Sequence, residues 1–377
     1  MADPGHVAVG TWSGGRHMHF GVALEEDRLA ALLRPGDGID TLLTADAYGA
    51  GEGDRLAGRA IAGMERDEVC LVGAIGHDFY EGEREGAKGY PRFTDPRLRG
   101  EEAYGDYVRM AVERSLERCG VDHFDLLLLH NPDLTGYRSE AVWSALAAVR
   151  DAGLTAGLGV APGPANGFTL DLIDCFERFG ALIDWAMVIL NPLEPWPGEL
   201  CMAAAQRHDV ALITRVVDYG GLLWDDVAAG HAFAERDHRL FRPEGWVEAG
   251  LERMEEMRPI ARRHGLTMLQ LACQWNLAHG PVACTVPTLI QEPGDQAPAV
   301  ESKRAELVAV PREVVLSDEE VAEIRRLGDN TGSMLLKGAT PDHDGAPQAD
   351  RWAVGEELAA VGARWGIDPG RDLRRAA

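Results

Sequence analysis

The stretch "FDLLLLH", residues 124–130, decides the fold class of this chain. It lies between a helical pattern over residues 101–120 and a second helical pattern over residues 139–153. A run of consecutive leucines has no polar face, so we expect a strand that is buried on both sides. Strands of this kind belong to parallel sheets that are covered by helices, which predicts an α/β protein.

The same alternation of short apolar runs and longer helical patterns extends in both directions. Strands are predicted at residues 6–12, 39–45, 68–76, 124–130, 155–161, 185–191, 210–217 and 282–287. Helices are predicted at residues 24–36, 53–64, 101–120, 139–153, 169–180, 198–209, 248–265, 267–280 and 316–330, the last with Ser317 as its cap. Eight βα units in about 330 residues predict a (β/α)8 TIM barrel. The alternative is an open doubly wound sheet, but no GxGxxG motif follows the first strand.

The chain is expected to form one barrel domain over residues 1–330 with a C-terminal extension over residues 331–377. The extension combines a Pro/Gly/Asp loop with one amphipathic helix near residues 352–364. We expect this tail to pack on the barrel. A position over the active site is the alternative.

The net charge of the chain limits the classes of molecule that it is expected to bind. The 377 residues carry a net charge of −24, which argues against nucleic acid and anionic membranes and leaves a small-molecule substrate. No apolar run is long enough to span a membrane. The first residues show no basic region followed by a long apolar region, so we expect no secretory signal. The six cysteines form no CxxC pair, so we expect reduced, buried thiols in a cytoplasmic protein. The oligomeric state stays open.

A second stretch, "GIDTLLTADAYGAGEGDRLAGRAI" (38–61), places Tyr48 in a Gly-rich turn between a strand and a helix. Together with "HFDLLLLHNPD" (123–133), "GLGVA" (157–161), "ITRVVDYGGLL" (213–223) and "ARRHGLTMLQLACQWNL" (261–277), it resembles the aldo-keto reductases. The resemblance covers roughly residues 6 to 330. It implies a barrel enzyme that transfers a hydride between NADPH and a carbonyl compound.

The resemblance also implies a catalytic tetrad of tyrosine, histidine, lysine and aspartate. Tyr48 matches the tyrosine that donates a proton to the carbonyl oxygen, and His130 matches the histidine that orients the carbonyl. The aspartate position falls on Leu43, and the lysine position falls on Ala74. Without the lysine ammonium, the pKa of Tyr48 is expected to be higher and the proton relay poorer.

The cofactor positions are matched in part. "GTW", Gly10, Thr11 and Trp12, resembles the segment beneath the nicotinamide, and Pro287 and Thr288 follow the last strand. Lys303 and Arg304, close to the start of a helix that the resemblance implies, are candidate ligands for the adenosine 2′-phosphate. Surface basic residues are the alternative interpretation for these two.

Polar residues at other strand ends complete the candidate site. His77 and Asp78 follow the strand at 68–76 and could replace the missing relay, because loops after barrel strands carry function. Arg215 is a candidate for binding the cofactor or a carboxylate or phosphate of the substrate, with a structural ion pair to Asp218 as the alternative. His77, Asp78, His130 and Asp218 could also converge on a metal ion, but no HxH, HxxxH or HExxH spacing links them, so a metal site is only the minor alternative.

The sequence is compatible with three functions. The first is NAD(P)H-dependent reduction or oxidation of a small carbonyl or hydroxyl compound, such as a sugar, with a non-standard proton relay. The second is redox-neutral elimination, dehydration or epimerisation on the same barrel, with Tyr48 and His130 as acid and base. The third is a non-catalytic binding protein that keeps the fold.

Overall fold

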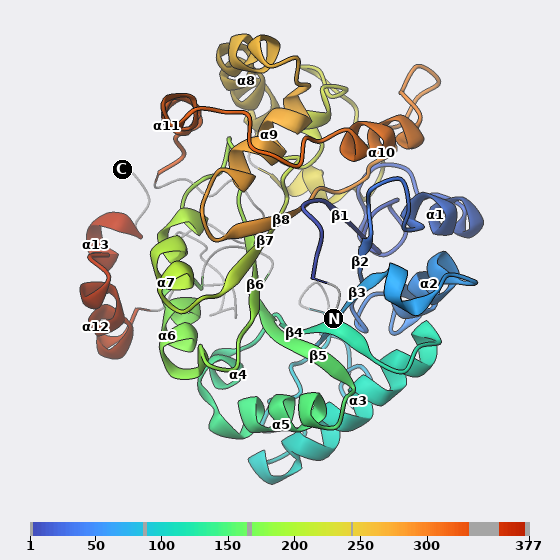
Figure 1. Ribbon diagram of the computed structural model, residues 1–377, viewed down its shortest axis with the longest axis vertical. Coiled ribbons are helices and arrows are strands. Elements are labelled where there is room, and N and C mark those ends of the chain that lie inside the picture. Colours follow the sequence, from blue (N-terminus) through green and yellow to red (C-terminus); the bar gives the residue numbers. More distant parts are fainter. Residues whose placement is uncertain (1–2, 86–88, 164–167, 243, 332–353, 374–377) are drawn as a thin grey trace.

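The computed structural model describes residues 3–85, 89–163, 168–242, 244–331 and 354–373 of the chain (Figure 1). Its centre is an eight-stranded sheet in the order β1 to β8. The strands are β1 (Ala8–Gly10), β2 (Thr41–Leu43), β3 (Cys70–Ile75), β4 (Phe124–His130), β5 (Thr155–Ala161), β6 (Trp185–Ile189), β7 (Ala211–Arg215) and β8 (Val282–Val286). Each strand pairs in parallel with the next, and a parallel bridge from Val7 to Thr285 joins the last strand to the first. The predicted (β/α)8 barrel is confirmed.

Helices surround the barrel on the outside (Figure 1). They are α1 (Glu26–Leu33), α2 (Glu52–Ile61), α3 (Tyr104–Cys119), α4 (Leu134–Arg138), α5 (Glu140–Asp151), α6 (Thr169–Phe179), α7 (Met202–Arg207), α8 (Trp246–Arg263), α9 (Met268–Leu277), α10 (Val300–Val308), α11 (Asp318–Leu327), α12 (Glu356–Arg364) and α13 (Pro369–Asp372). The predicted Ser317 cap is confirmed, because its hydroxyl accepts from the Glu320 amide. The apolar pattern gave no sign of α4, which is a single short turn with its N-cap at Asp133.

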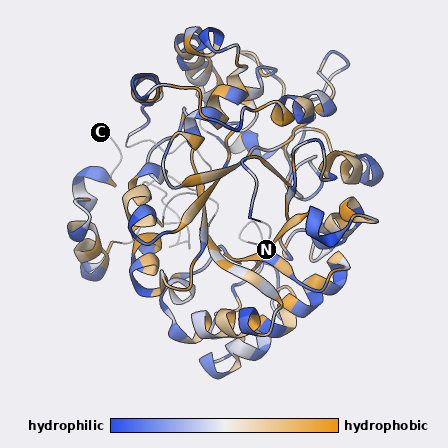
Figure 2. Ribbon diagram, in the orientation of Figure 1, coloured by the Kyte–Doolittle hydropathy of each residue, from blue (hydrophilic) through white to orange (hydrophobic). Residues whose placement is uncertain are grey.

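The apolar strands contribute side chains to two hydrophobic cores, one inside the barrel and one between the barrel and the helices. For this reason neither face of the strands is polar. Leu126 and Leu128 of β4 point into the barrel, where they join a cluster made by alternate residues of the strands. Leu127 and Leu129 point outward and pack with the helices. Figure 2 shows this distribution, with hydrophobic strands inside and hydrophilic stretches on the outer helices.

The described part of the C-terminal extension packs beside the barrel wall. Helix α12 contacts α6, and Arg364 pairs with Glu177 of α6. The Trp196 indole, in the loop after β6, donates to the backbone oxygen of Asp372 at a distance of 2.7 Å. Figure 1 places α12 and α13 alongside α6 and α7. Residues 332–353 lie outside the described part of the chain, including the start of the predicted helix near 352–364.

All six cysteines are free and buried, and their predicted burial is confirmed. Within the described ranges, no helix combines the length and apolarity needed to cross a membrane.

Candidate active site

Tyr48, His77, His130 and Arg215 all lie at the carboxyl ends of barrel strands. Tyr48 is in the turn after β2, His77 follows β3, His130 ends β4, and Arg215 ends β7. Because every strand runs in the same direction, these four residues lie at the same end of the barrel. That end carries the active site in barrels of this type.

Three of these side chains form a continuous row of rings with Trp12. The centroids of Trp12 and Tyr48 are 6.3 Å apart, and those of Tyr48 and His130 are 5.7 Å apart. His77 continues the row, with its ring centroid 5.2 Å from that of His130. Residues that are far apart in sequence therefore meet at one place, where a carbonyl group could contact both Tyr48 and His130.

The turn that holds Tyr48 depends on glycines. Gly49 and Gly51 have φ angles of 59° and 97°, which favour glycine. A Cβ added to Gly53, in the first turn of α2, would lie 2.9 Å from the Cβ of Tyr48. The Gly53 amide instead donates to the backbone oxygen of Tyr48 at 2.9 Å. The absence of a side chain at Gly53 lets the helix start directly against Tyr48.

The two positions that were predicted to correspond to the aspartate and the lysine lie in the apolar interior. Leu43 and Ala74 are buried members of the inner cluster, and Tyr48 packs against that cluster. Burial raises the pKa of Tyr48 to about 12, and the Arg215 cation opposes the rise. The hydroxyl is therefore protonated at neutral pH and is a weaker acid than a tyrosine beside an ammonium.

His130 is held in its neutral form. Burial, followed by the positive charges of its surroundings, keeps the pKa of His130 well below its usual range. Its Nδ1 atom is buried and has no hydrogen-bond partner among the described residues. A buried acceptor without a partner is better tolerated than a buried N–H without one, so the proton is expected on Nε2. That tautomer offers Nε2–H to a carbonyl oxygen.

His77 is also neutral, and the loop after β3 fixes its ring. Burial and the Arg92 guanidinium lower the pKa of His77 to about 3. Nδ1 lies 2.9 Å from the backbone oxygen of Tyr90, and the Asn131 amide lies 3.1 Å from Nε2. The ring is therefore oriented from both sides.

Asp78 has a different environment from its neighbour. Its carboxylate is fully buried, pairs with Arg99 and accepts from the backbone amides of Tyr80 and Glu81 at 3.0 Å each. These contacts hold the chain just after His77. Both oxygens are engaged, so Asp78 fits a positioning role for the loop better than a role in proton transfer.

The residues predicted beneath the nicotinamide lie beside Tyr48. A Cβ on Gly10 would collide with the Trp12 ring, so the glycine lets the ring fold back over β1. The Thr11 hydroxyl donates to Thr44, and the Thr11 amide donates to the backbone oxygen of Leu43. These contacts fix the start of the loop after β1.

The segment after β8 is tied to the loop after β7. Pro287 directly follows β8, and the amide of Thr288 donates to Asp218 at 2.8 Å. Asp218 also accepts from the Gly221 amide at 2.7 Å. Asp218 therefore caps backbone amides of both loops and forms no ion pair with Arg215, which was the alternative suggested by the sequence.

Lys303 and Arg304, at α10, have internal partners. The buried Lys303 ammonium lies 2.6 Å from a carboxylate oxygen of Asp226 and donates to the backbone oxygen of Ile290 at 2.7 Å. Arg304 donates to three backbone oxygens, those of Leu32, Arg34 and Gly36. The two predicted cations are therefore present beside the segment after β8, but both are already bonded to oxygen atoms of the protein.

Two contributors to the site lay outside the sequence-based predictions. Arg92 folds back beside His77 through an antiparallel bridge between these residues, and Asn131 has a positive φ of 48° directly after β4. The position of Asn131 after His130 was a usable signal, whereas the return of a long loop leaves no local pattern. Over the described ranges, no group of three or more His, Cys, Asp or Glu side chains could hold a metal ion.

A parallel (β/α)8 barrel with a tyrosine and a histidine at its mouth is the architecture of a class of carbonyl-reducing barrel enzymes. The model of the aldo/keto reductase family matches residues 6–329, and the chain belongs to that family. Aldo-keto reductase yakc of Schizosaccharomyces pombe, named for NADP(+), is 25% identical over 86% of this chain and 88% of its own length. A probable voltage-gated potassium channel subunit beta of Arabidopsis thaliana is 23% identical over 74% and 83%.

Solved structures share the fold. Glycerol dehydrogenase from Gluconobacter oxydans superposes with a TM-score of 0.63 at 22% identity, covering 85% of this chain and 90% of its own. An aldo/keto reductase from Klebsiella pneumoniae in complex with NADP and acetate gives a TM-score of 0.59 at 20% identity, covering 86% and 92%.

Proposed function

We propose that this chain is an oxidoreductase of the aldo-keto reductase type that reduces the carbonyl group of a small polar compound or oxidises the corresponding alcohol. The observation that carries the proposal is the pairing of Tyr48 with His130, whose ring centroids are 5.7 Å apart. A protonated tyrosine and a neutral histidine supply the proton and the hydrogen bond that a carbonyl oxygen needs as its negative charge develops. Sugars are one class of compound with such groups.

NADPH is the proposed cofactor, and when bound it supplies the hydride. Membership of the family supports this assignment, as does the NADP(+) in the name of a relative. At the reacting end, the donors of Tyr48 and His130 fit this chemistry. At the phosphate end, Lys303 and Arg304 have the right charge, but a 2′-phosphate at Lys303 has to replace the carboxylate of Asp226.

Residues of the chain supply the proton and position the substrate. Tyr48 donates its proton to the carbonyl oxygen, and His130 holds that oxygen through Nε2–H. His77 lies behind His130 and positions its ring. With a pKa of about 12, Tyr48 gives up its proton less readily than a tyrosine beside an ammonium, so a slow chemical step is expected.

The proposal is tested by following NADPH absorbance with a panel of aldehydes, ketones and sugars, and then by Tyr48→Phe. Loss of the proton donor is expected to lower kcat/KM about 100-fold or more. Tyr104→Phe is the matched control, because the Tyr104 hydroxyl is also buried and, among the described residues, donates to the Thr94 backbone oxygen alone. Equal activity of Tyr48→Phe and Tyr104→Phe would remove Tyr48 from the mechanism.

Redox-neutral proton transfer is the second candidate function. The apolar residues at the lysine and aspartate positions and the internal pairing of Lys303 favour it. In that case, hydroxy or oxo compounds are dehydrated or epimerised with no net consumption of NADPH. Product analysis without added cofactor distinguishes the two candidates.

A further inference from the structure

The side chain of Arg215 lies across the end of the barrel that carries Tyr48. Its Nη2 donates to the backbone oxygens of Pro162 and Gly163, at 3.2 Å and 2.5 Å. These acceptors directly follow β5, whereas Arg215 ends β7, so the side chain passes the end of β6. The two carbonyls fix the direction of the guanidinium but supply no negative charge.

Most of the donors of this guanidinium are unused. Nε and Nη1 of Arg215 donate to no atom of the described residues, although a guanidinium has five N–H groups. Burial lowers the pKa of Arg215, yet the residue is only partly buried by surface area. The group therefore lies deep in the protein and still reaches solvent, which are the conditions for a ligand contact.

No carboxylate compensates the charge of Arg215 within an ion-pair distance among the residues that the structure describes. The groups that face it are Tyr48, Tyr137 and Glu194. Both tyrosines have raised pKa values and stay neutral, and burial raises the pKa of Glu194 to about 7. One oxygen of Glu194 and the Tyr137 hydroxyl are buried and have no hydrogen-bond partner within the part of the chain that the structure describes. A cation in this setting gains from an anion that arrives with a ligand.

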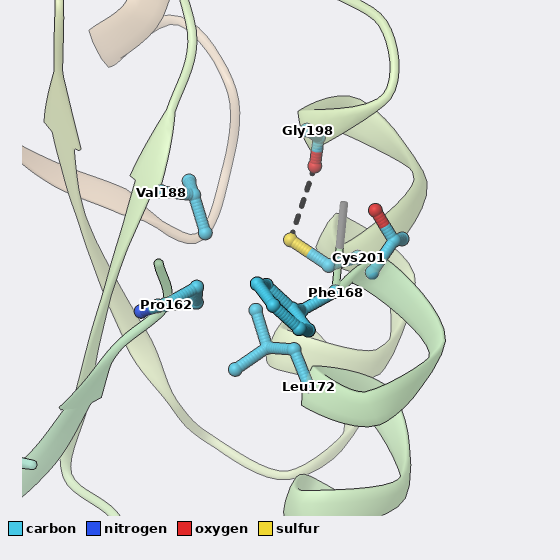
Figure 3. A pocket seen from close by; sticks show the side chains of 7 residues that line it. Pro162, Phe168, Leu172, Val188, Gly198 and Cys201 are labelled. Atoms are coloured by element: carbon cyan, nitrogen blue, oxygen red, sulfur yellow. Dashed lines mark hydrogen bonds between the residues drawn. The ribbon is translucent and has the colours of Figure 1, made fainter. Parts of the chain in front are cut away.

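The space behind the anchoring carbonyls offers no alternative site. A cavity of about 10 Å³ lies beyond Pro162, lined by apolar groups such as Phe168, Leu172 and Val188 (Figure 3). This volume holds about one water molecule. This cavity is too small for a carboxylate, so we place the anion that pairs with Arg215 on the side of the barrel mouth, where Tyr48 and His130 lie.

We propose that Arg215 anchors an anionic group of the substrate, so that the substrate is a small oxo acid whose carbonyl group faces Tyr48 and His130. The free donors, Nε–H and those of Nη1, can each donate to an oxygen of an anion. We take the anion to be a carboxylate, which is the smaller of the two common anionic groups, because Arg215 lies deep in the protein. The inference rests on the proposed function and adds the class of substrate to it.

The test compares charged and neutral partners of one carbonyl compound: pyruvate with methyl pyruvate, and dihydroxyacetone phosphate with dihydroxyacetone. The wild-type chain is expected to have the lower KM for pyruvate. Arg215→Gln is expected to raise the ratio of the KM for pyruvate to the KM for methyl pyruvate about 10- to 100-fold. Arg215→Lys keeps the positive charge but loses the planar guanidinium, and it is expected to recover part of the preference for pyruvate over methyl pyruvate.

Arg242→Gln is the matched control. Arg242 also faces Glu194, but its guanidinium covers the rings of Tyr219 and Trp246. It is expected to keep the wild-type ratio of the two KM values. A general loss of positive charge at the mouth would instead change the ratio in both variants and would overturn the assignment to Arg215.

A binding measurement without turnover separates this inference from the proposed function. Pyruvate is expected to raise the Tm of the wild-type chain more than methyl pyruvate does, and this difference is expected to vanish in Arg215→Gln. A preference for the phosphate pair alone keeps the anchor and assigns a phosphate. Equal stabilisation by charged and neutral partners overturns the anchor, whereas an absence of NADPH consumption with every carbonyl compound overturns the proposed function only.

Discussion

At the scale of single residues, the site is defined by what surrounds Tyr48. Its ring lies between those of Trp12 and His130, and its floor is the apolar cluster that contains Leu43 and Ala74. A single buried lysine or aspartate in that cluster would be an unpaired charge. Two apolar residues at these positions avoid that cost, at the expense of a higher pKa for Tyr48.

The double variant Leu43→Asp with Ala74→Lys tests this explanation. Each single variant is expected to lose about 3–5 kcal/mol of unfolding free energy, because it buries one unpaired charge. The double variant is expected to lose less than the sum of the two, and the pKa of Tyr48 is expected to fall from about 12. Urea unfolding and ultraviolet titration, with Tyr48→Phe as the blank, measure both effects. Additive losses and an unchanged tyrosine pKa would show that the two positions do not form a pair.

Several residues of the site could be placed from the sequence alone, and others could not. Tyr48 and His130 stand in motifs of fixed spacing beside strand ends, so their positions at the mouth could be predicted. The free donors of Arg215 and the internal partners of Lys303 depend on contacts between segments far apart in the chain. No local pattern encodes such contacts, so the resemblance and the charge together suggested a phosphate ligand at Lys303.

At the scale of elements, the loop after β3 holds His77 without charge. In the unfolded chain, His77 has its ordinary pKa of 6.5, whereas in the folded chain its pKa is about 3. Between these values the unfolded chain binds a proton that the folded chain does not bind. This contribution to stability is therefore present above pH 6.5 and is lost as the pH falls toward 3.

The expected size of this effect is about 2 kcal/mol between pH 7 and pH 5. His77→Gln removes the titrating group while its amide can still contact Tyr90 and Asn131. Urea unfolding at the two pH values is expected to show a smaller loss of stability for the variant than for the wild type. Equal losses would mean that His77 is protonated in the folded chain.

Helix α10 provides a second test at this scale. Asp226→Asn leaves the Lys303 ammonium buried without its carboxylate, at an expected cost of about 3–5 kcal/mol. If a 2′-phosphate takes the place of that carboxylate, NADPH is expected to raise the Tm of this variant more than NADH does. Asp37→Asn is the control, because Asp37 is an exposed partner of Arg304 and its loss is expected to cost under about 1 kcal/mol. Equal rescue by NADH would exclude Lys303 as the phosphate ligand.

The order of the elements followed from the sequence more reliably than their ends did. β4 and β5 begin and end where their apolar runs do, whereas β1 and β2 are shorter than predicted. The residues beyond these short strands leave the sheet to form the turns that carry Trp12 and Tyr48. β3, β6, β7 and β8 are also shorter than predicted, so the apolar pattern overestimates the length of most strands.

At the scale of the whole molecule, the protein is acidic, but the candidate active site at the barrel mouth contains positively charged side chains. The net charge is −24, yet Arg92 and Arg215 both act on His130 at the barrel mouth. We expect a local cationic mouth on an acidic surface to favour small anions over nucleic acid and other large polyanions. The described part of the extension, α12 and α13, packs beside α6 and α7.

The proposed function requires that this barrel binds NADPH and uses it to reduce a carbonyl compound. A titration of the purified protein with NADPH and NADH, followed by the fluorescence of its tryptophans, tests this requirement. We expect saturable quenching by NADPH with a Kd on the order of micromolar, in the range of ordinary cofactor affinities. No change in fluorescence with either nucleotide up to about 1 mM would contradict it, and the redox-neutral candidate would then take its place.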